Sequence, residues 1–275
     1  MRRALVCFCL VGSIPVATAI FLLYLTSPIP AQESSAEKAD PAKSAEASTA
    51  AEKKKYPEQK PELGAIEGRI ILEGPPPAVA PIDVTKSNKD HKACVKHVKN
   101  EILTLSDKKE VKDVVISIDS YKPTKKPKPR DIVVDNRHCS FVPHVQATTR
   151  NSKLTVLNSD KFLHNSRGVL AASFNFAIPA GGKFSKRLRK PGWVILKCDF
   201  HPWMTAHVQV FTHDLFDVTS EDGAFKIPNV PPGEYDLHVW HERLAPIKGR
   251  VIKTKVKVEA GKTVKLDLPL SAPKK

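Results

Sequence analysis

The segment Cys198–Met204 constrains the fold of this chain more than any other part of its sequence. It places a thiol at Cys198, an imidazole at His201 and a thioether at Met204, each separated from the next by two residues. β-Branched, strand-like sequence stands on both sides, so we expect a short loop between two strands that can bring three donors around one point. Thiolate, imidazole and weak thioether ligands are the set used by copper electron-transfer centres. The segment therefore predicts a copper site in a β-sheet protein.

Such a site needs a second imidazole, and His164 is the candidate because it follows the alternating run at residues 154–160. His164, Cys198 and His201 would form a trigonal plane, with Met204 on the axis, where it tunes the potential more than it binds. Each residue alone has an ordinary explanation. Methionine is common in cores, histidine on surfaces, and cysteine in the disulfides of exported proteins. The four residues in this order favour the metal site.

Residues 131–211 resemble a cupredoxin, the plastocyanin and amicyanin family. The matching stretches are Phe141-Val-Pro143, Asn158-Ser-Asp160, His164-Asn165 and the run from Pro191 to Met204. The resemblance implies one type 1 copper ion held by His164, Cys198, His201 and Met204. It also implies that Asn165 braces the cysteine loop, the kind of support that metal ligands normally receive. The matching region is short for the family, which leaves room for one or two missing strands.

The cysteine count supports a free thiolate. Cys7 and Cys9 lie in the N-terminal apolar segment, which leaves Cys94, Cys139 and Cys198, an odd number. In an oxidising compartment two of these would pair and one would be left over. The simplest assignment is a disulfide between Cys94 and Cys139 with Cys198 as the metal ligand. The alternative pairs Cys139 with Cys198, leaves Cys94 free and removes the key ligand.

The N-terminal region predicts export. Arg2 and Arg3 precede an apolar run from Ala4 to Leu25, so residues 1–31 are expected to be either a cleaved signal peptide or a retained membrane anchor. Residues 32–63 are rich in Ala, Glu, Lys, Ser and Pro and are expected to be a disordered linker. In either case the folded part would be periplasmic or on the extracytoplasmic face of the membrane.

Two segments flank the copper region. One runs from Gly64 to Gly74, and the other, Asp217–Leu237, carries turns at Asp222-Gly223 and Pro232-Gly233. Together they resemble the carboxypeptidase-regulatory-like, transthyretin-like β-sandwich, which has no catalysis of its own. We therefore expect residues 64–130 and 212–270 to form this sandwich. The predicted fold class is all-β: a cupredoxin-like Greek-key sandwich inserted in, or followed by, a second small β-sandwich.

Short apolar or alternating runs separated by Gly, Pro, Asn and Asp predict the individual strands. They are Ile66–Leu72, Val111–Ile118, Ile132–Val134, Lys153–Leu157, Trp193–Lys197, His207–Phe211, Ala224–Ile227, Tyr235–Trp240, Val251–Val258 and Thr263–Leu268. One short helix is expected within Asp83–Lys99.

The remaining histidines carry weaker predictions. His144 lies near the proposed site in sequence and could be a fifth ligand or a gate. His238 and His241 could make an interdomain contact or a second metal site. The others, which are His91, His97, His138, His207 and His213, are expected at the surface.

The formal net charge of +15 lies almost entirely in residues 64–275, because the linker is nearly balanced. A basic surplus can indicate nucleic-acid binding, but this chain carries an export signal and no nucleic-acid motif. An acidic redox partner protein or anionic lipid is the better expectation. Attachment to the membrane through the N-terminal segment would fit the same picture.

These observations predict an exported one-electron carrier or relay that is not an enzyme, with partners docking at an exposed edge of His201 beside Pro202 and Trp203. One alternative is an envelope structural or adhesion protein whose copper site is vestigial or only stores copper. Another is an enzyme subunit, but a lone type 1 centre lacks the histidine cluster of a catalytic copper site.

Overall fold

The computed structural model of the chain describes residues 62–86 and 90–272. The predicted signal peptide or anchor, and nearly all of the predicted linker, lie outside these residues. In the two described ranges, no helix is both long enough and apolar enough to cross a membrane. The described residues all belong to one compact unit, which contains all the strands described below.

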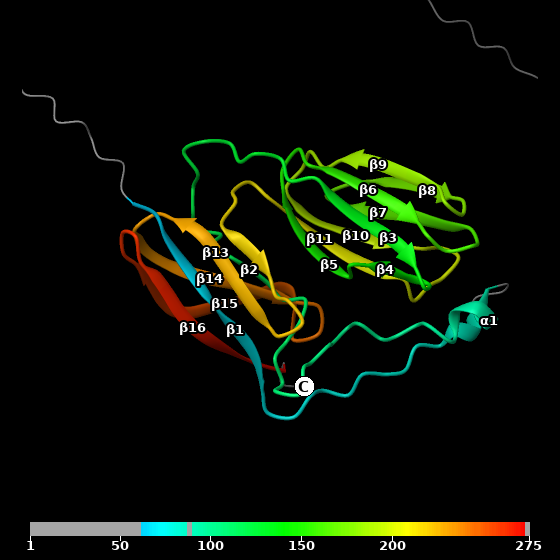
Figure 1. Ribbon diagram of the computed structural model, residues 1–275, viewed down its shortest axis with the longest axis horizontal. Helices are drawn as coiled ribbons and strands as arrows, with labels where there is room; N and C mark the ends of the chain where they lie inside the picture. Colours follow the sequence, from blue (N-terminus) through cyan, green and yellow to red (C-terminus); the bar gives the residue numbers. More distant parts are fainter. Residues whose placement is uncertain (1–61, 87–89, 273–275) are drawn as a thin grey trace, which may run out of the picture. The chain divides into compact units, whose positions relative to one another are not determined.

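Figure 1 shows a chain built almost wholly of strands. In chain order the elements are β1 (Gly64–Glu73), η1 (Val84–Lys86), α1 (His91–Cys94), β2 (Val115–Ser117), β3 (Ile132–Arg137), β4 (Ser140–Val142), β5 (Val145–Thr149), β6 (Lys153–Asn158), β7 (His164–Leu170), β8 (Phe174–Ile178), β9 (Lys183–Arg187), β10 (Gly192–Lys197), β11 (Thr205–Phe211), β12 (Phe216–Val218), β13 (Ala224–Val230), β14 (Gly233–His241), β15 (Ala245–Val258) and β16 (Thr263–Ser271). The expected all-β class is therefore confirmed.

Strands β3–β11 form a central sandwich of two sheets. One sheet has the order β5-β11-β10-β7-β8 and the other the order β4-β3-β6-β9. Alternating apolar side chains of the two sheets meet in one core, which includes Val134, Leu154, Val156, Val194 and Val208. Period-2 alternation explains this, because successive side chains of a strand point to opposite faces of its sheet.

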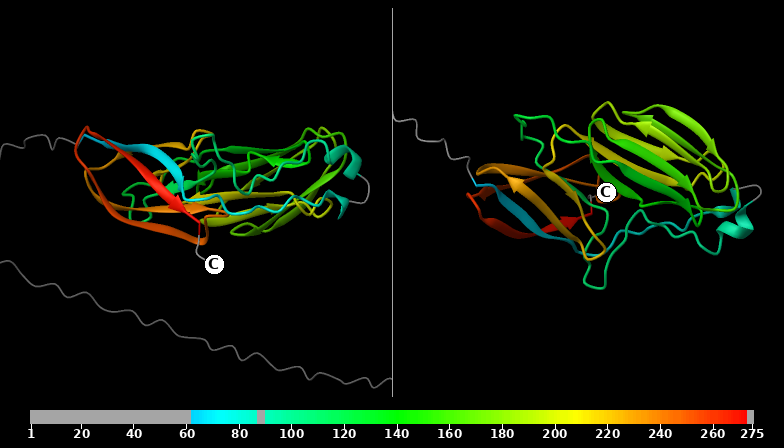
Figure 2. Two further views of the ribbon diagram at one scale, coloured as in Figure 1. Left: turned by 90° about the horizontal axis from the view of Figure 1, so that it is seen from below. Right: turned by 45° about the horizontal axis from the view of Figure 1, so that its top comes forward.

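The other strands form a flanking sandwich from segments on both sides of the central one. Its sheets have the orders β13-β1-β16 and β12-β2-β14-β15. Strand β1 pairs in parallel with β16, at the far end of the sequence, and antiparallel with β13. A second core, with Ile66, Ile70, Ile116, Ile227 and Leu237 among its members, lies between the sheets. The two layers of each sandwich can be followed in Figure 2.

A third apolar cluster joins the two sandwiches. Val145 and Phe211 of the central sandwich pack with Val115, Phe216 and Trp240 of the flanking one. Trp240 also packs against Trp193, with ring centroids 4.0 Å apart. Buried apolar contacts therefore hold the two sandwiches together.

The ten expected strands are present, although that at Val111–Ile118 is shorter. Only Val115–Ser117 is strand there, because Asp113 has a positive φ of 63° that bends the chain. Six strands were not anticipated: β4, β5, β7, β8, β9 and β12. Strand β9, Lys183–Arg187, shows why, since it lies at a sheet edge and is largely exposed, so it has no apolar alternation. The expected short helix is present as α1, with η1 before it.

Candidate metal centre

Cys198 lies just after β10, at the start of the loop that leads into β11. The loop is closed by two backbone hydrogen bonds, from Cys198 N to Met204 O at 3.3 Å and from Met204 N to His201 O at 2.9 Å. The thiol is 3% exposed and is the one free cysteine of the described residues. The loop therefore holds the thiol of Cys198 in a buried position at the end of the sheet.

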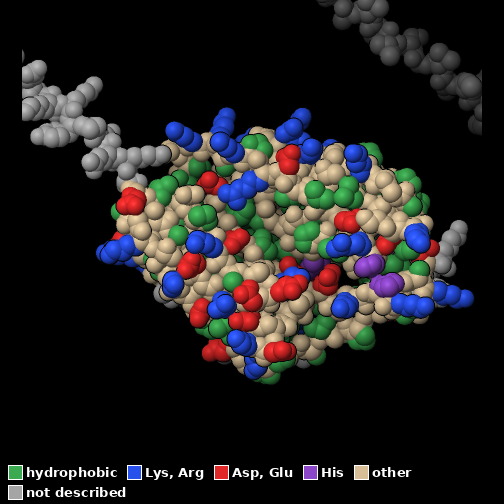
Figure 3. Space-filling view, in the orientation of Figure 1, with side chains coloured by type: hydrophobic (Ala, Val, Ile, Leu, Met, Phe, Trp, Pro, Cys, Tyr) green, Lys and Arg blue, Asp and Glu red, His purple; other side chains and the backbone are tan. Residues whose placement is uncertain are grey.

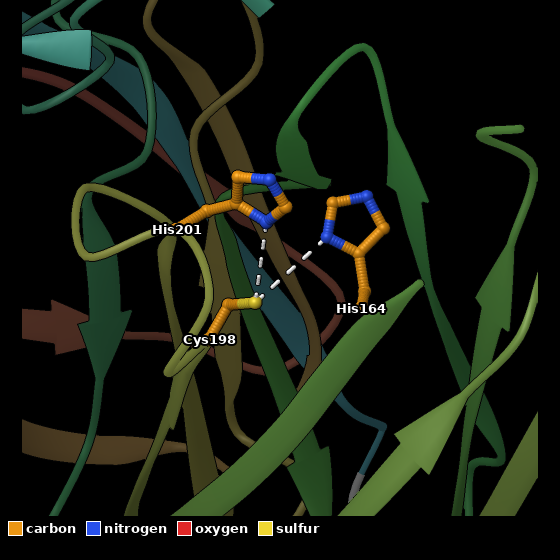
Figure 4. Close-up of side chains that lie close together, drawn as sticks. All are labelled: His164, Cys198 and His201. Carbon is orange, nitrogen blue, oxygen red and sulfur yellow. Dashed lines mark hydrogen bonds between the residues drawn. The ribbon is translucent and has the colours of Figure 1, made fainter. Parts of the chain in front are cut away.

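His164 reaches the same point from the neighbouring strand. Strand β7 pairs antiparallel with β10, and the register sets Lys197 opposite Arg167, so the start of β7 runs alongside the cysteine loop. The Sγ of Cys198 lies 3.8 Å from Nδ1 of His164 and 3.6 Å from Nδ1 of His201. Both rings turn the same nitrogen toward the sulfur, as Figure 4 shows.

These separations fit a metal ion bound by all three residues. With bonds typical of zinc, about 2.3 Å to sulfur and about 2.0 Å to nitrogen, donors about 120° apart lie about 3.7 Å from each other. The two sulfur–nitrogen distances bracket that value. Both imidazoles are fully buried. Soft sulfur with two imidazoles is a donor set that suits copper.

The far nitrogens of both rings face carboxylates. Nε2 of His164 lies 2.9 Å from Asp160 and donates to it, so its Nδ1 keeps a lone pair toward Cys198. Nε2 of His201 lies 3.4 Å from Asp90 but without hydrogen-bond alignment. A carboxylate behind a ligating imidazole fixes the ring and raises its basicity. Neither aspartate is predicted as part of the site from the sequence, although Asp160 lies only four residues before His164.

Asp160 also joins the centre to the disulfide. Its carboxylate accepts hydrogen bonds from the backbone N–H groups of His138 at 2.8 Å and Cys139 at 2.9 Å. Those two residues have positive φ angles of 55° and 57°, a turn that points both N–H groups the same way. From the other side, the indole N–H of Trp203 donates to the carbonyl of Cys139 at 3.0 Å. The turn at Cys139 therefore supports both His164 and the cysteine loop.

Asn165 occupies the bracing position expected from the sequence. Its Oδ1 accepts a hydrogen bond from the backbone N–H of Asp199 at 2.7 Å and lies 3.4 Å from the thiol of Cys198. Its Nδ2 donates to the carboxylate of Asp199 at 2.8 Å, and that carboxylate also pairs with Arg167 at 2.8 Å. One side chain of β7 thus holds the first two residues of the cysteine loop.

The surroundings of Cys198 favour its thiolate. Burial alone raises the pKa of this thiol, but the imidazoles of His164 and His201 and the backbone of Asn165 outweigh burial. Together they lower the pKa from the ordinary 9.0 to about 6. The thiolate is the form that binds metal ions, so the group is prepared for a cation at neutral pH.

A disulfide joins Cys94 to Cys139, the pairing preferred from the sequence, which leaves Cys198 as the free thiol. This link holds α1 near the centre, where Asp90 lies against His201. The expected exposed edge of His201 is therefore wrong, because the imidazole is 0% exposed. The segment that covers His201 lies more than a hundred residues earlier in the chain, so no local pattern predicts the contact.

His144 is not part of the Cys198 group. Its two ring nitrogens face the carbonyl of Thr205 and the carboxylate of Glu242, so the idea of a fifth copper ligand is wrong. His207 and His213, expected at the surface, are buried at 8% and 4% exposure. His97 and His138 are exposed, as expected, and their rings stack with centroids 5.0 Å apart. His238 lies 3.6 Å from Asp119.

Met204 is 2% exposed and packs in the same apolar cluster as Cys198. As an axial ligand it would tune the centre rather than create it. Met204→Leu should therefore keep copper and its colour while the reduction potential, measured by voltammetry, rises, because a donor that stabilises the oxidised ion is lost. Stability should change by less than ~1.5 kcal/mol, since the swap conserves volume. An unchanged potential would remove Met204 from the coordination sphere.

Comparisons with known proteins give partial matches. A family model described as polysaccharide lyase family 4, domain II, matches residues 216–266, within the flanking sandwich. The carboxypeptidase-regulatory-like assignment of that sandwich stays a prediction. A comparison with curated protein sequences finds no match.

Solved structures with some likeness to this chain include three copper proteins. A copper-containing nitrite reductase from Thermus scotoductus is 20% identical, with a TM-score of 0.28, and the match covers 33% of this chain and 24% of the reductase. A purple cupredoxin from Nitrosopumilus maritimus is 21% identical, with a TM-score of 0.27, over 30% of this chain and 100% of the cupredoxin. A variant of amicyanin in the Cu(I) state is 18% identical, with a TM-score of 0.27, and the match covers 30% of this chain and 82% of the amicyanin.

Proposed function

We propose that the chain binds one copper ion through His164, Cys198 and His201, with Met204 as a weak axial ligand, and works as a one-electron carrier or relay. The observation that carries the proposal is the convergence of two imidazole Nδ1 atoms on a buried thiol, at 3.6 Å and 3.8 Å. Copper in such a site supplies a single electron by cycling between two oxidation states.

The residues of the chain would keep the site rigid and dry. Asp160 and Asn165 hold His164 and the cysteine loop in place through hydrogen bonds made by the protein itself. Cys198, His164 and His201 are all buried, so water has little access to the donors. Rigid ligands that move little between oxidation states suit electron transfer, and no proton transfer or substrate pocket is required for that task.

Electrons would enter beside Phe162 rather than at His201. The Phe162 ring lies 5.1 Å from the ring of His164 and 5.7 Å from that of His201. Leu163 and Phe200, the neighbours of His164 and His201 in sequence, are 44% and 46% exposed. Exposed apolar side chains next to the ligands are the natural place for a redox partner to approach closely.

The partner would be an acidic redox protein, because the chain has a formal net charge of +15. On the face shown in Figure 3, Lys and Arg side chains line the upper edge and also lie across the face, with acidic side chains interspersed among them. The proposed location is the periplasm or the extracytoplasmic face of the membrane, with attachment through residues 1–31 if these are retained. We propose no role in binding nucleic acid and no enzyme activity.

One observation favours a second candidate function. Asp90 covers His201, and the disulfide at Cys94 fastens the covering segment. A covered ligand suits a copper-storing or structural envelope protein better than a carrier. Stopped-flow mixing of the reduced, copper-loaded chain with an excess of an oxidised small redox protein separates the two, since a carrier should be oxidised rapidly and a storage protein slowly.

The test of the copper site is a titration of the purified full chain with Cu²⁺. We expect one equivalent to give an intense absorption near ~600 nm, from charge transfer between the thiolate and the copper ion. Ascorbate should bleach it and air or ferricyanide should restore it. A complex that stays colourless even with excess Cu²⁺ would contradict the proposal.

A further inference from the structure

A second group of metal-binding side chains lies outside the Cys198 group: His144, His207 and Glu242. His144 immediately precedes β5, and His207 lies in β11, which pairs with β5 and sets His207 opposite Val145. The backbone N–H of His207 donates to the carbonyl of His144 at 2.8 Å. Glu242 follows β14 of the flanking sandwich. The three residues therefore come from both sandwiches to one place.

Their donor atoms converge. Nε2 of His144 lies 2.7 Å from Oε2 of Glu242, and Nε2 of His207 lies 3.2 Å from Oε1. One ligand atom from each of the three residues lies within 4.8 Å of the other two. The imidazoles are only 9% and 8% exposed, and their rings are nearly perpendicular, with centroids 5.6 Å apart.

The tautomer of His144 shows that a cation is needed between these groups. Its Nδ1 lies 3.0 Å from the carbonyl oxygen of Thr205, which can only accept, so Nδ1 carries the hydrogen. In a neutral ring, Nε2 then turns a lone pair toward an oxygen of Glu242 that also bears lone pairs. Nε2 of His207 is buried and has no hydrogen-bond partner in the structure. A proton on His144 or a metal ion relieves the first contact, and a metal ion would also take the lone pair of His207 Nε2, which lies 3.2 Å from the same carboxylate.

His241 supports the group without belonging to it. Its Nδ1 accepts hydrogen bonds from the backbone N–H groups of Arg243 at 3.1 Å and Leu244 at 3.2 Å. These bonds shape the turn after β14 that presents Glu242.

The group also has an open side. A cavity of about 210 Å³ is lined by His144 and Glu242, together with Ser140 and Thr205. On another side, the ring of Trp240 packs 5.1 Å from that of His207. Protein therefore covers part of the group, while the cavity leaves space for water or a small ligand beside the carboxylate.

We propose that His144, His207 and Glu242 bind a divalent transition-metal ion, with further coordination positions facing the cavity. Two imidazoles and one carboxylate suit zinc, copper(II) or iron(II), and they are a poor match for calcium or magnesium, which take oxygen ligands. The metal would also link the two sandwiches, because its ligands come from both. The site does not depend on copper at Cys198.

The test uses the full chain carrying Cys198→Ser, which removes the thiolate of the first site, and zinc as the probe. Isothermal titration should show one zinc ion bound. Glu242→Gln and His207→Gln are each added to this chain in turn. Each should weaken zinc binding by more than roughly 10–100-fold, which is the loss expected when only a group that supports a ligand is removed. His238→Gln is the matched control, because His238 also lies beside a carboxylate, that of Asp119 at 3.6 Å, and it should leave zinc affinity unchanged.

Thermal unfolding gives a second readout in the same proteins. Zinc should raise the melting temperature of the Cys198→Ser chain, because a ligand of the folded state stabilises it, and the shift should disappear with Glu242→Gln. Glu242 is partly exposed and Gln has its shape, so this variant is expected to fold. Zinc binding that survives both Glu242→Gln and His207→Gln would overturn the proposal. So would failure of the Cys198→Ser chain to bind zinc at all.

Discussion

Cys198→Ser should abolish the intense absorption near ~600 nm of the copper-loaded chain. That band requires a thiolate sulfur bonded to copper, and a serine hydroxyl is a hard donor that stays protonated at neutral pH. Without a sulfur ligand, any copper that remains bound should be colourless or pale. The measurement is the visible spectrum of both proteins at equal copper concentration.

The matched control for this loss is Trp203→Phe in the same loop. Trp203 is not a donor to the metal and contributes a hydrogen bond to the carbonyl of Cys139. This variant should keep the band, although copper could be held less rigidly. The serine variant should still fold, since its hydroxyl can replace the thiol against Asn165. Survival of the band in Cys198→Ser would eliminate the proposed copper centre.

Replacing Cys94 and Cys139 together by serine should lower the free energy of unfolding by about 4 kcal/mol. The two cysteines are 45 residues apart, and the chain-entropy model gives about this value for a closed loop of that size. For a folded region of this length, the melting temperature should fall by roughly 10 °C. Chemical denaturation of the metal-free proteins, followed by tryptophan fluorescence, measures the difference.

The same double variant should change access to the centre. Without the disulfide, the segment that carries Asp90 is no longer fastened to the turn at Cys139, so His201 should become easier for a partner to reach. A second route for electrons should then open at His201, in addition to the one beside Phe162, so electron exchange should be faster, and the copper should be less firmly held. Val95→Ala is the control, because Val95 is 56% exposed in the same segment and makes no cross-link.

The stability experiment has its own contradicting outcome. If the double variant loses less than about 1 kcal/mol of unfolding free energy, the disulfide does not constrain the unfolded chain.

Local sequence was sufficient for the parts of the centre that lie close together in the chain. The spacing from Cys198 to Met204 sets which donors one short loop can present, because a loop between two adjacent strands leaves few arrangements. The odd number of cysteines outside the N-terminal segment pointed to Cys198 as the free thiol. Alternating apolar residues also predicted the strands that face the two cores, since that pattern follows directly from the pleat of a strand.

Polar strands at a sheet edge could not be predicted from the sequence, because they lack the alternation of apolar residues by which the other strands were predicted. Strand β9 is largely exposed and has no apolar face to alternate, so pairing with its neighbour decides that it is a strand. The same limit applied to His207. It lies in an expected strand, but it is buried by contacts that the sequence does not reveal, among them Glu242 and Trp240 of the flanking sandwich.

What the sequence by itself determined is thus the all-β class and the short-range pattern of donors, because both depend on interactions between residues close in the chain. Tertiary structure alone decided which distant residues meet. Asp90 covers His201, and Glu242 reaches His144 across 98 residues, because strand register and the packing of the two sandwiches bring them together. Those contacts follow from the shape of the whole fold, and local sequence carries no information about it.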